Sequence, residues 1–159
     1  MRRPIALLAV LALAAAALAG FTAIASSAAT KPATVKTGTS SLGRIVVDGK
    51  SHTLYLFAKD KHGKSTCSGA CAQNWPPLLT KGKPKAGTGA KASLLGTTKR
   101  ADGTTQVTYN KHPLYTFIAD NNKRGSTQGE GVDAFGAKWY VVAAKGTAKT
   151  GGSSSNGGY

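Results

Sequence analysis

The sequence predicts a mostly β fold: a compact antiparallel domain made of two fused, related repeats, with a short helical turn near a cysteine pair. The first observation behind this is that segment 52–60 returns at 112–120, so the pattern H-x-L-Y-x-F-x-x-D occurs twice, sixty positions apart. Such a repeat indicates one supersecondary unit used twice. The second is that short runs of β-branched and aromatic residues alternate with Gly- and Asn-containing turns, which is typical of antiparallel sheets.

The first repeat is predicted to contain a hairpin followed by a short helix. The β-rich runs 45–47 and 53–57 flank the turn residues Asp48-Gly49, which is a hairpin signal. Residues 67–75 can form one or two helical turns. Pro76-Pro77 would end them, because proline lacks the N–H group that a helix interior needs.

The second repeat is predicted to be a series of short strands. Residues 93–98 and 104–109 flank a turn at Asp102-Gly103, and further strands are expected over about 113–118 and 138–143. Alternate residues of a strand share a face, so the Tyr and Phe of each motif should point one way and its leucines the other. We expect the aromatic face to enter the core, and an aromatic cleft between the repeats is the alternative.

The remaining chain is predicted to be a leader and a tail. The boundaries are a signal peptide at 1–29, a flexible leader at 30–41, the domain at 42–145 with repeats at about 42–80 and 92–145, and a disordered Gly/Ser tail at 146–159. The signal peptide follows from Arg2-Arg3, an Ala- and Leu-rich run and small residues after it, and an uncleaved anchor helix is the alternative. Phe21 stands where a lipobox would need cysteine, so we expect a secreted or otherwise extracytoplasmic protein without an acyl anchor.

The formal net charge of +15 restricts the expected partners. Without Arg2 and Arg3 the charge would still be +13, with only six acidic residues in the chain. A strongly basic exported protein is attracted to polyanions, so anionic envelope polymers or lipid headgroups are the expected partners. A soluble basic surface with no specific partner is the alternative. No nucleic-acid motif is present, so no specific nucleic acid is expected, and we expect a monomer.

The repeated polar and aromatic positions are the candidate binding residues: His52, Tyr55, Asp60, His112, Tyr115 and Asp120. An Asp directly after a strand commonly accepts backbone N–H groups and fixes the turn that follows. Alternatively, each Asp could join the histidine of its own strand to hold a metal ion. One His and one Asp per copy is a thin ligand set, and we expect no cofactor and no metal site.

Cys67 and Cys71 are the only thiols, and an even count in an exported chain predicts a disulfide. Closing so short a loop stabilises by about 2 kcal/mol on the chain-entropy estimate. A redox-active pair is the alternative, although the spacing is C-x-x-x-C rather than C-x-x-C. No catalytic motif is found, so no enzyme is expected. A hydrolase would need carboxylates such as Asp60 and Asp120 brought together across the fold.

Segments 54–60, 65–72 and 75–79 occur in order, and the second copy follows at 114–120 with 131–136 and Trp139-Tyr140 after it. Together they resemble the bacterial secreted repeat family with a Y-x4-D motif, also described as predicted lipoproteins with a Yx(FWY)xxD motif. The resemblance covers about residues 42–145, and it implies an exported tandem repeat without implying a mechanism. Many relatives carry a lipobox cysteine, which this chain lacks.

These features favour an exported repeat domain that acts as a non-catalytic binding module. The alternative is an extracytoplasmic protein that handles redox equivalents, a metal or haem through His52, Asp60, His112 and Asp120.

Overall fold

The computed structural model describes residue 29 and residues 31–150. The strands are β1 (Thr34–Ser40), β2 (Gly43–Asp48), β3 (Tyr55–Phe57), β4 (Lys85–Ala86), β5 (Leu95–Lys99), β6 (Thr105–Tyr109), β7 (His112–Pro113), β8 (Asp133–Ala134) and β9 (Ala137–Val141). The helical elements are α1 (Ala70–Asn74) and the 3-10 turns η1 (Ala92–Leu94) and η2 (Ile118–Asp120). The sheets have the orders β2-β1-β4, β3-β9-β8 and β5-β6-β7. Only the short β1–β4 pair among these strands is parallel, so the predicted antiparallel β class is confirmed.

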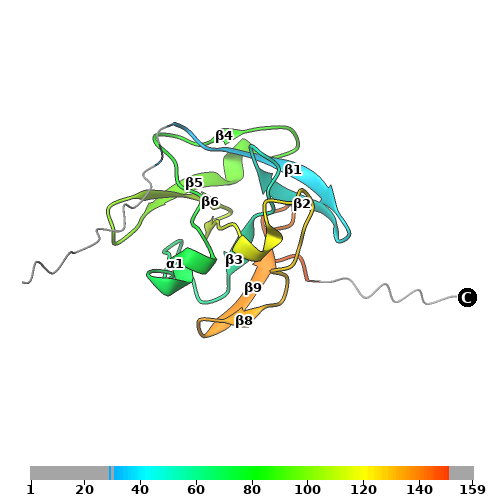
Figure 1. Cartoon of the computed structure of the whole chain (residues 1–159). Coiled ribbons are helices and arrows are strands. Elements are labelled where there is room, and N and C mark those ends of the chain that lie inside the picture. Colours follow the sequence, from blue (N-terminus) through cyan, green and yellow to red (C-terminus); the bar gives the residue numbers. More distant parts are fainter. Residues whose placement is uncertain (1–28, 30, 151–159) are drawn as a thin grey trace, which may run out of the picture.

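The two repeats contribute equivalent hairpins. β1 pairs with β2 and β5 pairs with β6, both in antiparallel register. In Figure 1 the β1–β2 hairpin lies at the upper right and the β5–β6 hairpin at the left, with β9 in the lower part of the view. The helix α1 follows the motif strand of the first repeat and contains Cys71, so the predicted helical turn near the cysteine pair is confirmed. The repeated sequence therefore corresponds to a repeated structural unit.

The repeats are interlocked through the segment that follows each tryptophan. The segment after Trp75 pairs with the second repeat: Leu78 N donates to Leu114 O, and Val107 N donates to Leu78 O. The segment after Trp139 pairs in the same way with the first repeat: Val142 N donates to Leu54 O, and Val46 N donates to Val142 O. Each repeat thus completes the backbone pairing of the other, which is why two units make one domain.

Two apolar clusters form the core, and the β3 strand supplies both. Tyr55 and Phe57 belong to one cluster, whereas Leu54 and Leu56 belong to the other. The alternation expected from the sequence is confirmed, and the aromatic side of the strand faces the junction of the repeats.

Three sequence predictions need correction. Residues 34–40 of the expected flexible leader form β1, because Val35 is fully buried and the strand pairs with both β2 and β4. The ordered chain also extends past 145, since Ala148 bridges to Val142 and Lys149 N donates to Val141 O. The strand expected over 113–118 is largely absent: β7 ends at Pro113, Tyr115 forms only isolated bridges, and η2 begins at Ile118.

The signal peptide and most of the expected tail lie outside the described residues. Within residues 29 and 31–150, no helix has the length and apolar character needed to cross a membrane.

Candidate functional site

The two motif tyrosines bind the motif aspartates of the opposite repeat. Tyr55 Oη donates to Asp120 Oδ2 at 2.7 Å, and Tyr115 Oη donates to Asp60 Oδ2 at 2.7 Å. Their backbones are also paired, because Tyr55 N donates to Tyr115 O and Tyr115 N donates to Tyr55 O. The repeated motif is therefore a reciprocal cross-link between the repeats, and no Tyr pairs with the Asp of its own copy.

These four side chains are buried in the core. Burial and the hydrogen bond to Asp120 raise the pKa of Tyr55 far above its usual 10.0. Burial and the charge of Asp60 likewise raise the pKa of Tyr115 above 10.0. Both phenols therefore remain protonated donors. The aromatic cleft considered as an alternative is instead packed core.

The second oxygen of each motif aspartate holds the loop that follows. Asp60 Oδ1 accepts Thr66 N at 2.7 Å and Thr66 Oγ1 at 2.8 Å. Asp120 Oδ1 accepts Ser126 Oγ at 2.7 Å and Gln128 N at 3.0 Å. These bonds match the turn-fixing role expected of an Asp after a strand. Thr66 and Ser126 were not among the predicted site residues, although each is a hydroxyl residue six positions after its Asp.

A column of four stacked rings joins the repeats beside these pairs. Phe57 stacks on Trp139 at 4.1 Å between centroids, Trp139 on Trp75 at 4.0 Å, and Trp75 on Phe117 at 4.0 Å. The tyrosines meet the column edge-on, Tyr55 against Trp75 and Tyr115 against Trp139. Each Phe stacks on the Trp of the other repeat, so the column repeats the reciprocal arrangement of the Tyr–Asp pairs.

The motif histidines do not join the motif aspartates in a metal site. His52 Nδ1 lies 3.0 Å from Asp48 Oδ2, and Asp48 Oδ1 accepts the N–H groups of Lys50 and His52 itself. Among residues 29 and 31–150, no group of three His, Cys, Asp or Glu side chains could share a metal ion. The carboxylates of Asp60 and Asp120 are instead hydrogen-bonded to protein donors on both oxygens.

His112 is expected to make stability depend on pH. Burial lowers the pKa of its imidazole below the usual 6.5, and the charge of Asp60 opposes this only in part. The unfolded chain therefore binds the proton at a higher pH than the folded one. Above about pH 7 the imidazole is neutral in both states, and its full contribution to the free energy of unfolding is present. As the pH falls below 6.5 toward the folded pKa, the unfolded chain binds the proton first and this contribution is lost.

Urea unfolding of the protein and of His112→Asn, followed from about pH 5 to about pH 8, measures this effect. The difference in stability between the two proteins should change only below about pH 7. A difference that stays constant over the whole range would contradict the assignment.

The cysteine pair forms the predicted disulfide, and both residues are buried. A buried arginine that was not among the predicted site residues fixes this segment. Arg100 donates to Cys67 O at 2.7 Å, to Ser65 Oγ at 2.8 Å and to Gln106 Oε1 at 2.8 Å. Ser65 Oγ in turn lies 2.7 Å from Tyr115 Oη. A redox-active pair is typically partly exposed, whereas this one is enclosed by the core.

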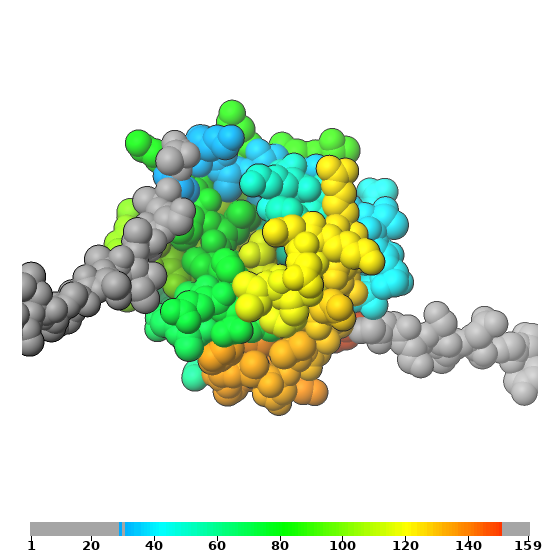
Figure 2. Space-filling view, viewed as in Figure 1, coloured from blue at the N-terminus to red at the C-terminus, as the bar shows by residue number. Residues whose placement is uncertain are grey.

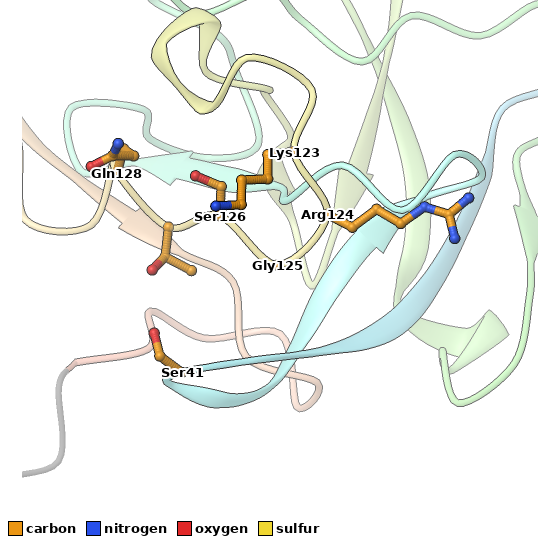
Figure 3. Close-up of a pocket in the computed structure, with 7 residues that line it drawn as sticks. Ser41, Lys123, Arg124, Gly125, Ser126 and Gln128 are labelled. Carbon is orange, nitrogen blue, oxygen red and sulfur yellow. The ribbon is translucent and has the colours of Figure 1, made fainter.

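The accessible features lie on the surface loops. The segment 121–128, which we call the second motif loop, crosses the viewed face between the β1–β2 hairpin and the α1 segment (Figure 2). Beside it is a cavity of about 330 Å³. The cavity is lined by Ser41, Lys123, Arg124, Gly125, Ser126, Thr127 and Gln128. No acidic residue is among them. Figure 3 shows the Lys123 side chain folded back toward Ser126, whereas Arg124 extends away in the opposite direction.

In the described part of the chain, most of the positive charge lies on lysines at the surface, outside ion pairs. Fourteen of the sixteen lysines are exposed. Within the described residues the ion pairs are His52–Asp48 and Arg100–Asp102, so no lysine is paired there. Five of the six acidic side chains accept hydrogen bonds from protein donors, namely Asp48, Asp60, Asp102, Asp120 and Glu130. Most acidic side chains are therefore used in hydrogen bonds within the protein, whereas most lysines are exposed to solvent.

Comparison with known proteins identifies the family and no individual relative. No curated protein and no solved structure matches the chain. A model of a secreted repeat of unknown function matches residues 36–79 and 96–143, one match for each repeat. The two matches contain the Tyr–Asp motifs and the two stacked tryptophans, and together they span more than half of the chain. The chain belongs to this family of secreted repeats.

Proposed function

We propose that this secreted repeat is a non-catalytic binding module for anionic polymers of the cell envelope. The observation that supports the proposal is the division of charges. Nearly all lysines are exposed and unpaired within the described residues, whereas the few acids are used in internal hydrogen bonds. A surface of this kind attracts polyanions and gains affinity by releasing their counterions.

A soluble polymer fits this surface better than a lipid bilayer. Among the described residues, the large hydrophobic side chains that are exposed are Ile118 and Phe135. Stable attachment to a membrane usually combines basic residues with inserted apolar side chains or a lipid chain. A polymer with a charge on every unit needs only spaced cations, which the lysines supply.

The repeated Tyr–Asp pairs support a structural role for the motif rather than a catalytic one. Asp60 and Asp120 are buried and accept hydrogen bonds from Tyr, Thr, Ser and backbone donors. General acid–base work needs a group that reaches the substrate. The function therefore belongs to the surface that these pairs hold in shape.

Binding to a soluble poly(glycerol phosphate) tests the proposal. We expect saturable binding that weakens at least tenfold between about 50 and 200 mM salt, since each neutralised phosphate releases a counterion. Neutral dextran of similar length is the control and should not bind. Absent or salt-insensitive binding would overturn the proposal, and tighter binding to anionic lipid vesicles than to the polymer would replace the polymer with a membrane surface.

A further inference from the structure

We infer that the cavity beside the second motif loop is a subsite for one phosphodiester group of the polymer. The inference rests on the proposed function and gives that function a specific place. The lining supplies hydroxyl, amide and cationic groups and no carboxylate. Such a lining offers hydrogen-bond donors and one sign of charge, as a phosphate oxygen requires.

The loop also offers backbone donors. Ser126 N donates to Lys123 O across a turn in which Gly125 has a φ of 71°. Within the part of the chain that the structure describes, the N–H groups of Arg124, Gly125 and Thr127 donate to no protein acceptor. Successive free N–H groups in a turn form the kind of concavity that binds anions.

The loop is held in place before any ligand arrives. Asp120 binds Ser126 Oγ and Gln128 N, and Thr53 Oγ1 donates to Ser126 O. Gly125 packs so closely on the end of β1 that a Cβ atom there would lie 2.9 Å from Thr39 O. A site held in this way loses little conformational entropy on binding. The core motif aspartate thus shapes the surface cavity directly.

The two cations that line the cavity, Lys123 and Arg124, suit a phosphate group. A lysine acts on phosphate as a point charge, and an arginine can bind phosphate through two parallel N–H groups. Both residues line the cavity, with Lys123 folded back toward Ser126 and Arg124 extending in the opposite direction (Figure 3). A phosphodiester group in the cavity therefore meets two cations together with neutral hydroxyl and amide donors.

The site is specific to the second repeat. The position that corresponds to Gly125 in the first repeat is Ser65, sixty residues earlier. The Ser65 hydroxyl is bound to Arg100 and to Tyr115, so this part of the first loop turns toward the core. The two repeats share the aspartate that pins the loop and differ in what the loop presents.

Amide NMR during a titration with sodium phosphate, with sodium chloride withdrawn to keep the ionic strength constant, tests the subsite. We expect saturable shifts of the Arg124, Gly125 and Thr127 amides. Lys123→Ala should weaken phosphate binding about tenfold, because it removes a hydrogen bond to a charged group. Lys99→Ala is the matched control: Lys99 is also an exposed lysine but lies on β5 outside the cavity, and its loss should leave the shifts unchanged.

The outcomes separate the subsite from the general proposal. If the polymer binds with the expected salt dependence but phosphate shifts are absent, spread over all lysines or equally reduced by both variants, the subsite is wrong and the binding function stands. If the polymer does not bind at all, the proposed function fails. A polycarboxylate of matched charge density that produces the same shifts as poly(glycerol phosphate) would overturn the assignment to phosphate.

Discussion

Replacement of Asp120 by alanine is expected to lower the free energy of unfolding by about 3 kcal/mol, because a buried acceptor of several hydrogen bonds is lost. The carboxylate is 5% exposed and accepts bonds from Tyr55 Oη, Ser126 Oγ and Gln128 N. Without it, the Tyr55 hydroxyl is left in the core without its carboxylate acceptor. Equilibrium denaturation by urea, followed by tryptophan fluorescence, measures the change.

Asp102→Ala is the matched control for this variant. Asp102 also accepts two hydrogen bonds from a nearby residue, Thr104, and pairs with Arg100 at 3.5 Å, but its side chain is 44% exposed. Water can replace those bonds, so the loss should be no more than about 1 kcal/mol. Equal losses for Asp102→Ala and Asp120→Ala would show that the buried cross-link has no special weight.

A double-mutant cycle with Tyr55→Phe isolates the Tyr–Asp pair. Phe fills nearly the same volume and removes only the hydroxyl that donates to Asp120. The loss in the double variant should be smaller than the sum of the two single losses by at least about 1 kcal/mol. Additive losses would mean that the 2.7 Å hydrogen bond contributes nothing of its own.

The sequence predicted the parts of this arrangement that depend on local pattern. Alternation along the strand placed Tyr55 and Phe57 on one face, and the position of Asp60 after the strand indicated a fixed turn. The pattern could not show that Tyr55 meets Asp120 rather than Asp60. That choice depends on a contact between residues 65 positions apart, and on the crossing of the Leu78 and Val142 segments between repeats.

At β1, local sequence pattern predicts the wrong structure. Its sequence of Thr, Lys and Gly with a single buried Val has the composition of a linker, and local pattern predicts a flexible leader. Pairing with β2 and burial of Val35 create the strand, so tertiary context overrides a weak propensity. The metal hypothesis also relied on the repeated motif alone, which does not contain the partner of His52. His52 pairs with Asp48, four residues before it, and that partner lies outside the repeated motif.

The motif also links the core to the surface. Asp120 uses one oxygen to bind Tyr55 and the other to pin the second motif loop, so its two contacts join the repeat interface to the loop that carries Lys123. A structural role for the motif and a binding role for the surface are therefore parts of one arrangement. The buried Asp120 position requires a carboxylate for its contacts on both sides, whereas the loop residues between Asp120 and Ser126 are free to differ between repeats.

The second large effect is expected for Trp75→Ala, which should lower the free energy of unfolding by about 4 kcal/mol. Trp75 is 1% exposed and stacks on both Trp139 and Phe117, with Tyr55 against its edge. Alanine would leave a gap in the middle of the column. The neighbouring rings come from both repeats and from separate backbone segments, so they cannot close the gap without moving the interlocked strands.

A loss of this size is a large share of the stability of a small domain, which totals about 5–15 kcal/mol. If Trp75→Ala does not fold, Trp75→Phe keeps the test informative, because it retains a ring while shortening the stack and should lose about 1–2 kcal/mol. Phe135→Ala is the control, since that ring is 41% exposed and lies outside the column. Trp139 fluorescence reports the unfolding of both Trp75 variants. Equal midpoints for Trp75→Phe and Phe135→Ala would mean that the stacked column, and with it the tryptophan of each repeat, does not hold the two halves together.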